Sequence, residues 1–152
     1  MAYSHPMAPV ASVLGDVYLG IDHVGVAYRD LEDGAGLWQS LGLRETHREV
    51  NDEQGVAEAM LAVPTTSLFL QVLAPLEPDS PVGRFIATRG QGLQQIALRV
   101  SDIDEACRRV AAHGLRLISP TPRAGTLGSR INFIHPKDAG GVLVELVEHA
   151  SH

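Results

Sequence analysis

Four polar residues each stand alone within an apolar, strand-like run and could together bind a metal ion. They are His23, Gln71, Gln95 and Glu145. Alternate side chains of a strand share a face, so each would be the polar member of an otherwise apolar face. Taken singly, a His or Gln on a strand is more often exposed or hydrogen-bonded in a core than it is a metal ligand. A buried carboxylate such as Glu145 is costly unless it is paired, and a metal ion is the simplest common partner.

An internal repeat relates these four residues to one another. A shift of 72 superimposes residues 22–26 on 94–98 and residues 42–44 on 114–116, and a shift of 74 places residues 68–73 on 142–147. His23 then corresponds to Gln95, and Gln71 corresponds to Glu145. The repeat therefore predicts four polar side chains around a pseudo-twofold axis.

Glu58 is a further charge inside an apolar run, residues 55–61. One interpretation is an edge-strand charge that blocks aggregation. The other is a catalytic base whose pKa is raised toward neutral by partial burial. His47, His113 and His149 fit no such pattern and are interpreted as surface histidines.

A glycine-rich segment, residues 122–130, carries Arg123 and Arg130. The strand-like residues 131–134 follow it, so it lacks the strand-loop-helix context of a phosphate-binding loop. A mobile loop that contacts an anionic ligand and a simple solvated loop both fit this composition.

Each half of the chain predicts one strand, one helix and three further strands. The first strands are residues 21–28 and 93–100, and the helices begin after Asp30 and after Ser101 or Asp102. Gly42 and Gly114 follow the helices at positions typical of a helix end. The second half is less clear between residues 115 and 128. A helical connection is expected over residues 80–89.

The modules, about 19–76 and 91–149, are each too small for a substantial core of their own and must pack together. We therefore expect one domain over residues 19–149, preceded by a flexible tail over residues 1–18. Lys plus Arg number 12 against 18 Asp plus Glu, a formal charge of −6 without a basic cluster. This balance argues against nucleic acid and membrane partners. The single cysteine, Cys107, fits a reducing cytoplasm.

The segments around these residues resemble the methylmalonyl-CoA epimerase family of the vicinal oxygen chelate superfamily. The matching stretches are residues 22–25, 53–58, 70–75, 129–137 and 140–146, so the resemblance covers about residues 21–148. It implies an α+β fold in which two βαβββ modules form a cupped mixed sheet. It also implies a homodimer with one divalent metal ion per cup, cobalt first and manganese, magnesium or nickel as alternatives.

The resemblance also implies the roles of the residues. His23, Gln71, Gln95 and Glu145 would bind the metal, and Glu58 and Glu145 would exchange the C2 proton of methylmalonyl-CoA through an enolate that the metal stabilises. The family normally has a histidine where this chain has Gln95, which leaves one nitrogen and three oxygen ligands and favours harder ions. Arg123, Arg130 and Lys137 are the candidates for binding the anionic acyl-CoA.

Two other functions remain open at this point. One is epimerisation of a related acyl-CoA, such as ethylmalonyl-CoA. The other is a metal-free small-molecule binding protein of the same fold, which the replacement of a histidine ligand by Gln95 would explain.

Overall fold

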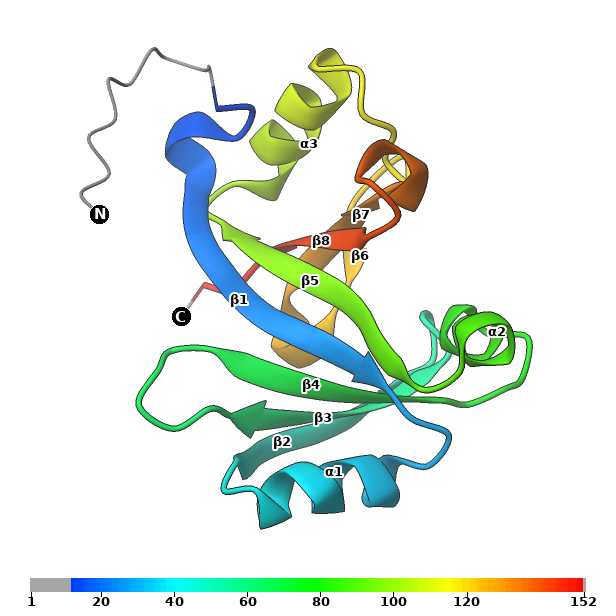
Figure 1. Ribbon diagram of the computed structural model, residues 1–152. Coiled ribbons are helices and arrows are strands. Elements are labelled where there is room, and N and C mark those ends of the chain that lie inside the picture. The colour runs from blue at the N-terminus through cyan, green and yellow to red at the C-terminus, as the bar shows by residue number, and fades with distance from the viewer. Residues whose placement is uncertain (1–11, 152) are drawn as a thin grey trace, which may run out of the picture.

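One curved mixed sheet organises the chain, as the computed structural model, which describes residues 12–151, shows (Figure 1). Eight strands lie in the order β2-β3-β4-β1-β5-β8-β7-β6. Their bounds are β1 Tyr18–Ala27, β2 Arg44–Asn51, β3 Val56–Ala62, β4 Phe69–Pro75, β5 Gly92–Val100, β6 Arg123–Ala124, β7 Arg130–Ile134 and β8 Leu143–Glu148. Neighbouring pairs are antiparallel except β1 with β4 and β5 with β8, so the sheet is mixed. The predicted α+β fold is confirmed.

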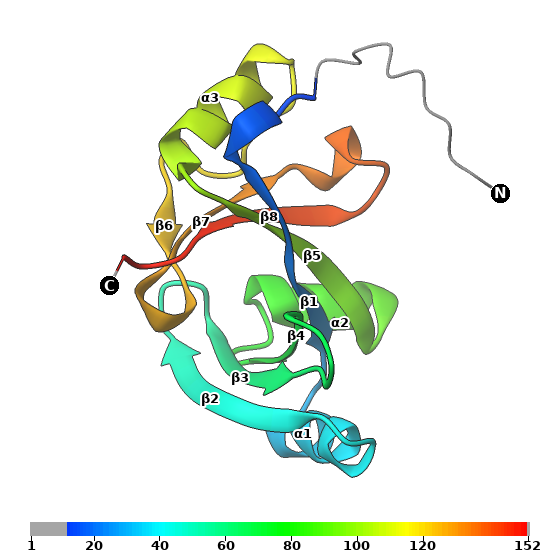
Figure 2. The same cartoon turned by 90° about the vertical axis from the view of Figure 1, so that its left-hand side faces the viewer.

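The described residues form three α-helices, which lie on the outside of the sheet (Figures 1 and 2). They are α1 Leu31–Ser40, α2 Pro81–Arg89 and α3 Ile103–Ala112. Asp30 accepts a hydrogen bond from the backbone N–H of Asp33, and Asp102 accepts one from Glu105, so both predicted caps are present. Gly42 and Gly114 follow α1 and α3 with φ of +110° and +89°, a left-handed conformation that favours glycine.

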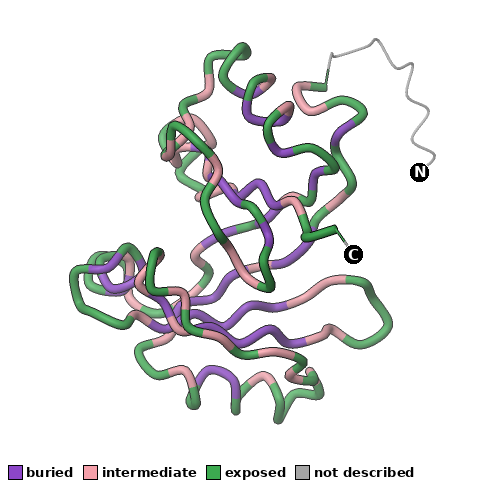
Figure 3. Tube along the Cα trace, turned by 180° about the vertical axis from the view of Figure 1, so that it is seen from behind, coloured by how far each residue is buried: buried purple, intermediate pink, exposed green. Residues whose placement is uncertain are grey.

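Each module buries its outward strand face under its own helix. Ala35 of α1 packs with Ala59, Leu61 and Val72 of β3 and β4. In the other module, Ile103, Ala106 and Val110 of α3 pack with Leu146 of β8 and Val100 of β5. Figure 3 shows the buried segments concentrated along the strands. Because the outward faces hold the apolar cores, the opposite faces of the same strands are left to line the cup.

The second module departs from the repeat where the sequence was unclear. The counterpart of the eight-residue β2 is β6, which has two residues, and Leu117 forms only an isolated bridge with Ile134. Pro120 and Pro122 lie in this stretch and cannot donate to a strand ladder. Three strands follow the helix of this module as expected, but the first of them is reduced to two residues.

The predicted tail over residues 1–18 needs correction at its end. Residues 1–11 lie outside the described part of the chain. Val13, Leu14 and Val17 pack against the α3 core, and Val17 is buried. The packed chain therefore begins before residue 19. Among residues 12–151, no helix is both long and apolar enough to cross a bilayer.

Candidate active site

The two central strands bring the predicted ligands together. β1 and β5 are antiparallel neighbours, and Gly25 is paired with Gln95 while His23 is paired with Ala97. β4 lies on the other side of β1 and β8 on the other side of β5, which adds Gln71 and Glu145. All four polar side chains are at most 7% exposed. Strand parity and the repeat therefore predicted a real cluster.

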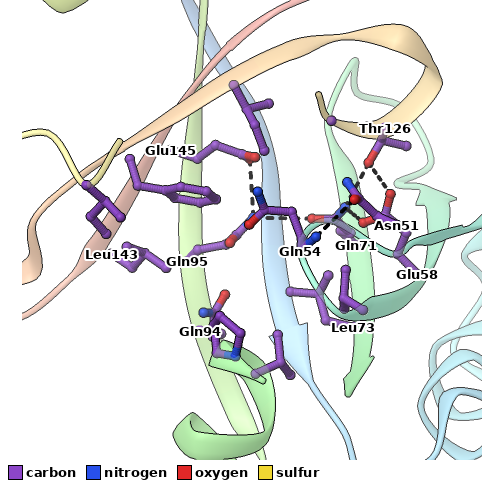
Figure 4. A pocket seen from close by; sticks show the side chains of 17 residues that line it. Asn51, Gln54, Glu58, Gln71, Leu73, Gln94, Gln95, Thr126, Leu143 and Glu145 are labelled. Carbon is purple, nitrogen blue, oxygen red and sulfur yellow. Dashed lines mark hydrogen bonds between the residues drawn. The ribbon is translucent and has the colours of Figure 1, made fainter. Parts of the chain in front are cut away.

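Hydrogen bonds connect the polar side chains of the cluster, and Figure 4 shows those that join Gln71, Gln95 and Glu145. His23 Nε2 is 2.8 Å from Glu145 Oε2. Gln95 Nε2 donates to Glu145 Oε2 and to Gln71 Oε1, both at 3.2 Å, and lies 3.5 Å from His23 Nε2. It is Gln95, and not its neighbour Gln94, that reaches this cluster.

Glu58 joins the cluster from β3. Its Oε2 accepts a hydrogen bond of 2.8 Å from Gln71 Nε2, and its Oε1 accepts one from Thr126 Oγ1. Glu58 is 3% exposed, so it is a buried carboxylate and not an edge-strand charge in contact with water. Burial first, and then the nearby Glu49 and Glu145, raise the pKa of Glu58 to about 7, against the lowering effect of the Thr126 hydroxyl. This side chain can therefore gain and lose a proton near neutral pH.

His23 is oriented by a residue outside the predicted site. Asp22 Oδ2 is 2.7 Å from His23 Nδ1, so the other ring nitrogen faces Glu145. Burial lowers the pKa of His23, but Asp22 and Glu145 outweigh it and raise the pKa to about 10. Asp22 also contacts His149 Nε2 at 2.6 Å. A carboxylate behind a histidine in this way fixes the ring of a metal ligand.

The donor set fits a small divalent cation. Ligands at right angles around an octahedral ion, each roughly 2.1 Å from it, lie about 3 Å apart. Glu145 Oε2 lies 2.8 Å from His23 Nε2, and Gln95 Nε2 lies 3.2 Å from Gln71 Oε1, 3.2 Å from Glu145 Oε2 and 3.5 Å from His23 Nε2, separations close to this value. Gln95 directs its Nε2 toward the other donors, so its amide must turn to offer Oε1 to an ion. Within residues 12–151 no three His, Cys, Asp or Glu side chains form a metal cluster, and both Gln71 and Gln95 would be needed.

Two cavities meet at this cluster. The first, of about 140 Å³, has both Glu58 and Glu145 in its wall together with apolar side chains such as Leu73 and Phe133. The second, of about 490 Å³, is lined by His23, Glu145 and Thr126 among others. Two buried carboxylates thus border one small cavity.

None of the three cationic candidates lines either of these cavities. Arg130 pairs with Asp104 of α3 at 2.9 Å, and Arg123 pairs with Glu53. Lys137 is exposed in the short 3₁₀ helix Pro136–Asp138. Arg123 lines a third hollow beside the first cavity, whereas Arg130 and Lys137 line none of the three.

Several site residues escaped the sequence reasoning. Thr126 lies in a glycine-rich loop without periodicity. Asp22 was not singled out because it directly precedes His23, the residue to which a role was assigned. His149 is exposed, as the sequence predicted, whereas His47 is half-buried; both line the second cavity. His47 Nε2 lies 2.6 Å from Glu49 Oε2. The sequence signal for His47 was Glu49, two positions further along the same strand. Side chains two apart on a strand share a face, so the two could be expected to pair.

The fold is that of a known superfamily. Residues 22–133 match the model of the Glyoxalase/Bleomycin resistance protein/Dioxygenase superfamily, and the chain belongs to this superfamily. Within it, the chain is similar to methylmalonyl-CoA epimerases. The crystal structure of the Mycobacterium tuberculosis enzyme is 51% identical, with a TM-score of 0.86 over 89% of this chain and 91% of that one.

Two further relatives carry names that specify ligands. A methylmalonyl-CoA epimerase in complex with methylmalonyl-CoA and NH4+ is 42% identical, with a TM-score of 0.85 over 88% of this chain and 96% of that one. An ethylmalonyl-CoA/methylmalonyl-CoA epimerase of Cereibacter sphaeroides is 33% identical over 129 residues, which are 83% of this chain and 95% of that protein.

Proposed function

We propose that this protein interconverts the 2R and 2S epimers of methylmalonyl-CoA. The observation that carries the proposal is the hydrogen-bonded series Glu58, Gln71, Gln95, Glu145, which joins two buried carboxylates bordering one cavity. Epimerisation at one carbon requires a proton acceptor on one face and a proton donor on the other. The similarity to enzymes named for this reaction supports the same assignment.

The chemistry begins with the acidity of the substrate. C2 of methylmalonyl-CoA lies between a thioester and a carboxylate, so its proton is weakly acidic and its removal gives an enolate. In the proposed reaction Glu58 takes the C2 proton from one epimer, and Glu145 returns a proton to the opposite face. The reverse direction exchanges the two roles. A pKa of about 7 for Glu58 suits a group that must act both as base and as acid.

Burial of the cluster excludes water from the reacting carbon. Glu58, Gln71 and Glu145 are each at most 5% exposed. In such surroundings, fixed dipoles and charges act on a developing negative charge more strongly than they would in water. Asp22 holds the imidazole of His23 in place, and Gln71 holds the carboxylate of Glu58.

We further propose that His23, Gln71, Gln95 and Glu145 hold a divalent cation, with cobalt as the first candidate. A bound cation supplies Lewis-acid stabilisation of the negative charge on the enolate oxygen. With three oxygen donors and one nitrogen donor, the set also suits manganese, magnesium or nickel. Homodimer formation, a cytoplasmic location and acyl-CoA binding by Arg123, Arg130 and Lys137 stay predictions.

Ethylmalonyl-CoA is a second candidate substrate, because the Cereibacter sphaeroides relative is named for both compounds. A binding protein without catalysis is less compatible with the site. Two buried carboxylates that border an apolar cavity are costly to maintain and offer little to a ligand that needs no proton transfer.

The proposal is tested with single epimers of both compounds. The cobalt-loaded protein is incubated with (2S)-methylmalonyl-CoA or (2S)-ethylmalonyl-CoA, and the 2R epimer is quantified by chiral chromatography. We expect conversion of methylmalonyl-CoA to an equal mixture. Glu58→Gln should abolish conversion, while Glu77→Gln, at an exposed glutamate, should leave it unchanged. Conversion by Glu58→Gln at the wild-type rate would refute the two-base scheme.

A further inference from the structure

A short loop of the second module crosses the cup and contacts the first module. We call residues 124–129 the strap. Asn51 at the end of β2 donates its Nδ2 to the carbonyl of Ala124 at 3.2 Å, and the backbone N–H of Leu127 lies 3.2 Å from Glu49 Oε2. Arg123, which precedes the strap, pairs with Glu53. The strap is therefore anchored to the first module on both sides of Thr126.

The strap is held in a strained and closely packed conformation. Leu127 has φ of 55° and ψ of 36°, the left-handed region that a leucine seldom adopts. A Cβ added to Gly125 would meet Ile131 Cγ2 and Ser129 Oγ at 2.6 Å. Backbone hydrogen bonds from Gly125 N to Ser129 O at 2.9 Å and from Ser129 N to Thr126 O at 3.0 Å close the turn. Strain of this kind persists where the surrounding contacts fix one geometry.

The consequence of this geometry is the placement of the Thr126 hydroxyl. It donates to Glu58 Oε1 and accepts a hydrogen bond of 3.2 Å from Gln71 Nε2 (Figure 4). Gln71 Nε2 also donates to Glu58 Oε2 at 2.8 Å. Each oxygen of the Glu58 carboxylate thus has its own donor, one from the strap and one from β4. Two donors on different oxygens fix the plane of the carboxylate, whereas Gln71 alone would leave it free to rotate.

We propose that Thr126 is the positioning residue that aims Glu58 at the C2 proton. The inference rests on the proposed epimerase function and extends it. A base must approach the proton within hydrogen-bond reach and with a correctly directed lone pair, and small misplacements cost large factors in rate. The Thr126 hydroxyl donates its proton to Glu58, so the loss of this donor acts on the face of the substrate that Glu58 serves. Glu145 accepts no hydrogen bond from the strap among the described residues, so its face is independent of Thr126.

This asymmetry distinguishes positioning from a general structural role. In deuterated buffer, the C2–H bond of one epimer breaks and its proton passes to Glu58, while the other epimer gives its proton to Glu145. A deuteron then forms the new C2–D bond. If Thr126 aims Glu58 alone, its removal slows the loss of hydrogen from only one epimer. Partial unfolding or poor substrate binding would slow both epimers equally.

The test compares the initial C2 exchange rates of the two pure epimers, measured by mass spectrometry. For Thr126→Val we expect the exchange of one epimer to fall between roughly tenfold and a hundredfold, with the other epimer near the wild-type rate. Thr126→Ser should keep the ratio of the two exchange rates at its wild-type value, because serine retains the hydroxyl. Thr88→Val, at an exposed threonine of α2, is the matched control and should change neither rate.

The outcomes separate the two proposals. No exchange of either epimer by the wild-type protein would refute the epimerase function. If the wild-type protein is active and Thr126→Val slows the exchange of both epimers by the same factor, the positioning role alone is overturned. Because the two rates are measured on the same preparation, their ratio does not depend on the fraction of folded protein.

Discussion

Gly25 of β1 faces Gln95 of β5 so closely that no side chain fits between them. A Cβ built on Gly25 would lie 2.5 Å from Cγ of Gln95 and 3.1 Å from Cδ1 of Leu73. Both contacts are shorter than ordinary van der Waals separations. The glycine therefore sets the depth at which Gln95 enters the cluster, and its role is steric since its φ is not positive.

Replacing this glycine should disturb the cluster directly. We expect Gly25→Ala to displace Gln95, lower the free energy of unfolding by about 1–3 kcal/mol and weaken metal retention. Thermal melting and metal analysis after dialysis measure the two effects. Gly36→Ala is the control, since nothing lies within 4 Å of its added Cβ on α1; it should be neutral or slightly stabilising. Equal stability of Gly25→Ala and wild type would show that the sheet adjusts freely at this point.

Gln95 is the member of the proposed ligand set that we expect to bind a metal ion most weakly. A neutral amide oxygen binds a transition metal less strongly than an imidazole does. The amide Nε2 of Gln95 also donates hydrogen bonds to Glu145 and Gln71. We predict that Gln95→His retains cobalt longer than wild type during dialysis against a chelator, with residual metal measured by elemental analysis. Faster loss of cobalt from Gln95→His would contradict the assignment of Gln95 as a ligand.

Glu145 has two proposed roles that one substitution should remove together. Its Oε2 contacts both His23 and Gln95, so Glu145→Ala takes away a donor and the proton-transferring group at once. We expect this variant to lose both bound metal and epimerisation. Glu58→Gln should lose only epimerisation, because Glu58 contacts the cluster through Gln71 and is not among the four proposed ligands. Full metal content in Glu145→Ala would remove it from the ligand set.

Glu58 should make the folded state sensitive to pH. Its pKa rises from an ordinary 4.5 to about 7 on folding, so between these values the folded state holds a proton that the unfolded state has lost. The free energy of unfolding of the wild type therefore decreases as pH rises through this range, by at most about 3 kcal/mol from this group.

Replacing the carboxylate by an amide removes this contribution. In chelator-treated samples, Glu58→Gln should be more stable than wild type at about pH 8, and the difference should shrink toward about pH 5. Urea titrations at the two pH values measure the change. A stability difference that stays constant between them would mean that Glu58 titrates normally in the folded protein.

Strand parity and the repeat made the cluster predictable from the sequence. The candidate ligands each alternate with apolar residues along their strands: His23, Gln71, Gln95 and Glu145. A side chain on a strand points to one face of the sheet or to the other. Gly42 and Gly114 likewise marked the ends of α1 and α3. Periodic elements carry this information in the local sequence, which is why both the α+β fold and the candidate ligands could be identified.

Thr126 and the cationic side chains could not be placed in this way. Thr126 reaches Glu58 across 68 residues of chain through a turn that contains the left-handed Leu127, and no periodic pattern specifies that path. Arg130 was a candidate by composition, yet it lies beside Asp104 of α3. For loop residues, the partner depends on the tertiary path of the chain rather than on spacing in the sequence.

Deuterium incorporation at C2 of methylmalonyl-CoA is the most direct test of the proposed chemistry. Wild-type protein, stripped of metal or loaded with cobalt, is incubated with substrate in deuterated buffer, and the deuterium content at C2 is measured by mass spectrometry. We predict rapid incorporation by the cobalt-loaded protein and slow incorporation by the stripped protein. Incorporation by the cobalt-loaded wild type that does not exceed the buffer background would contradict the epimerase assignment.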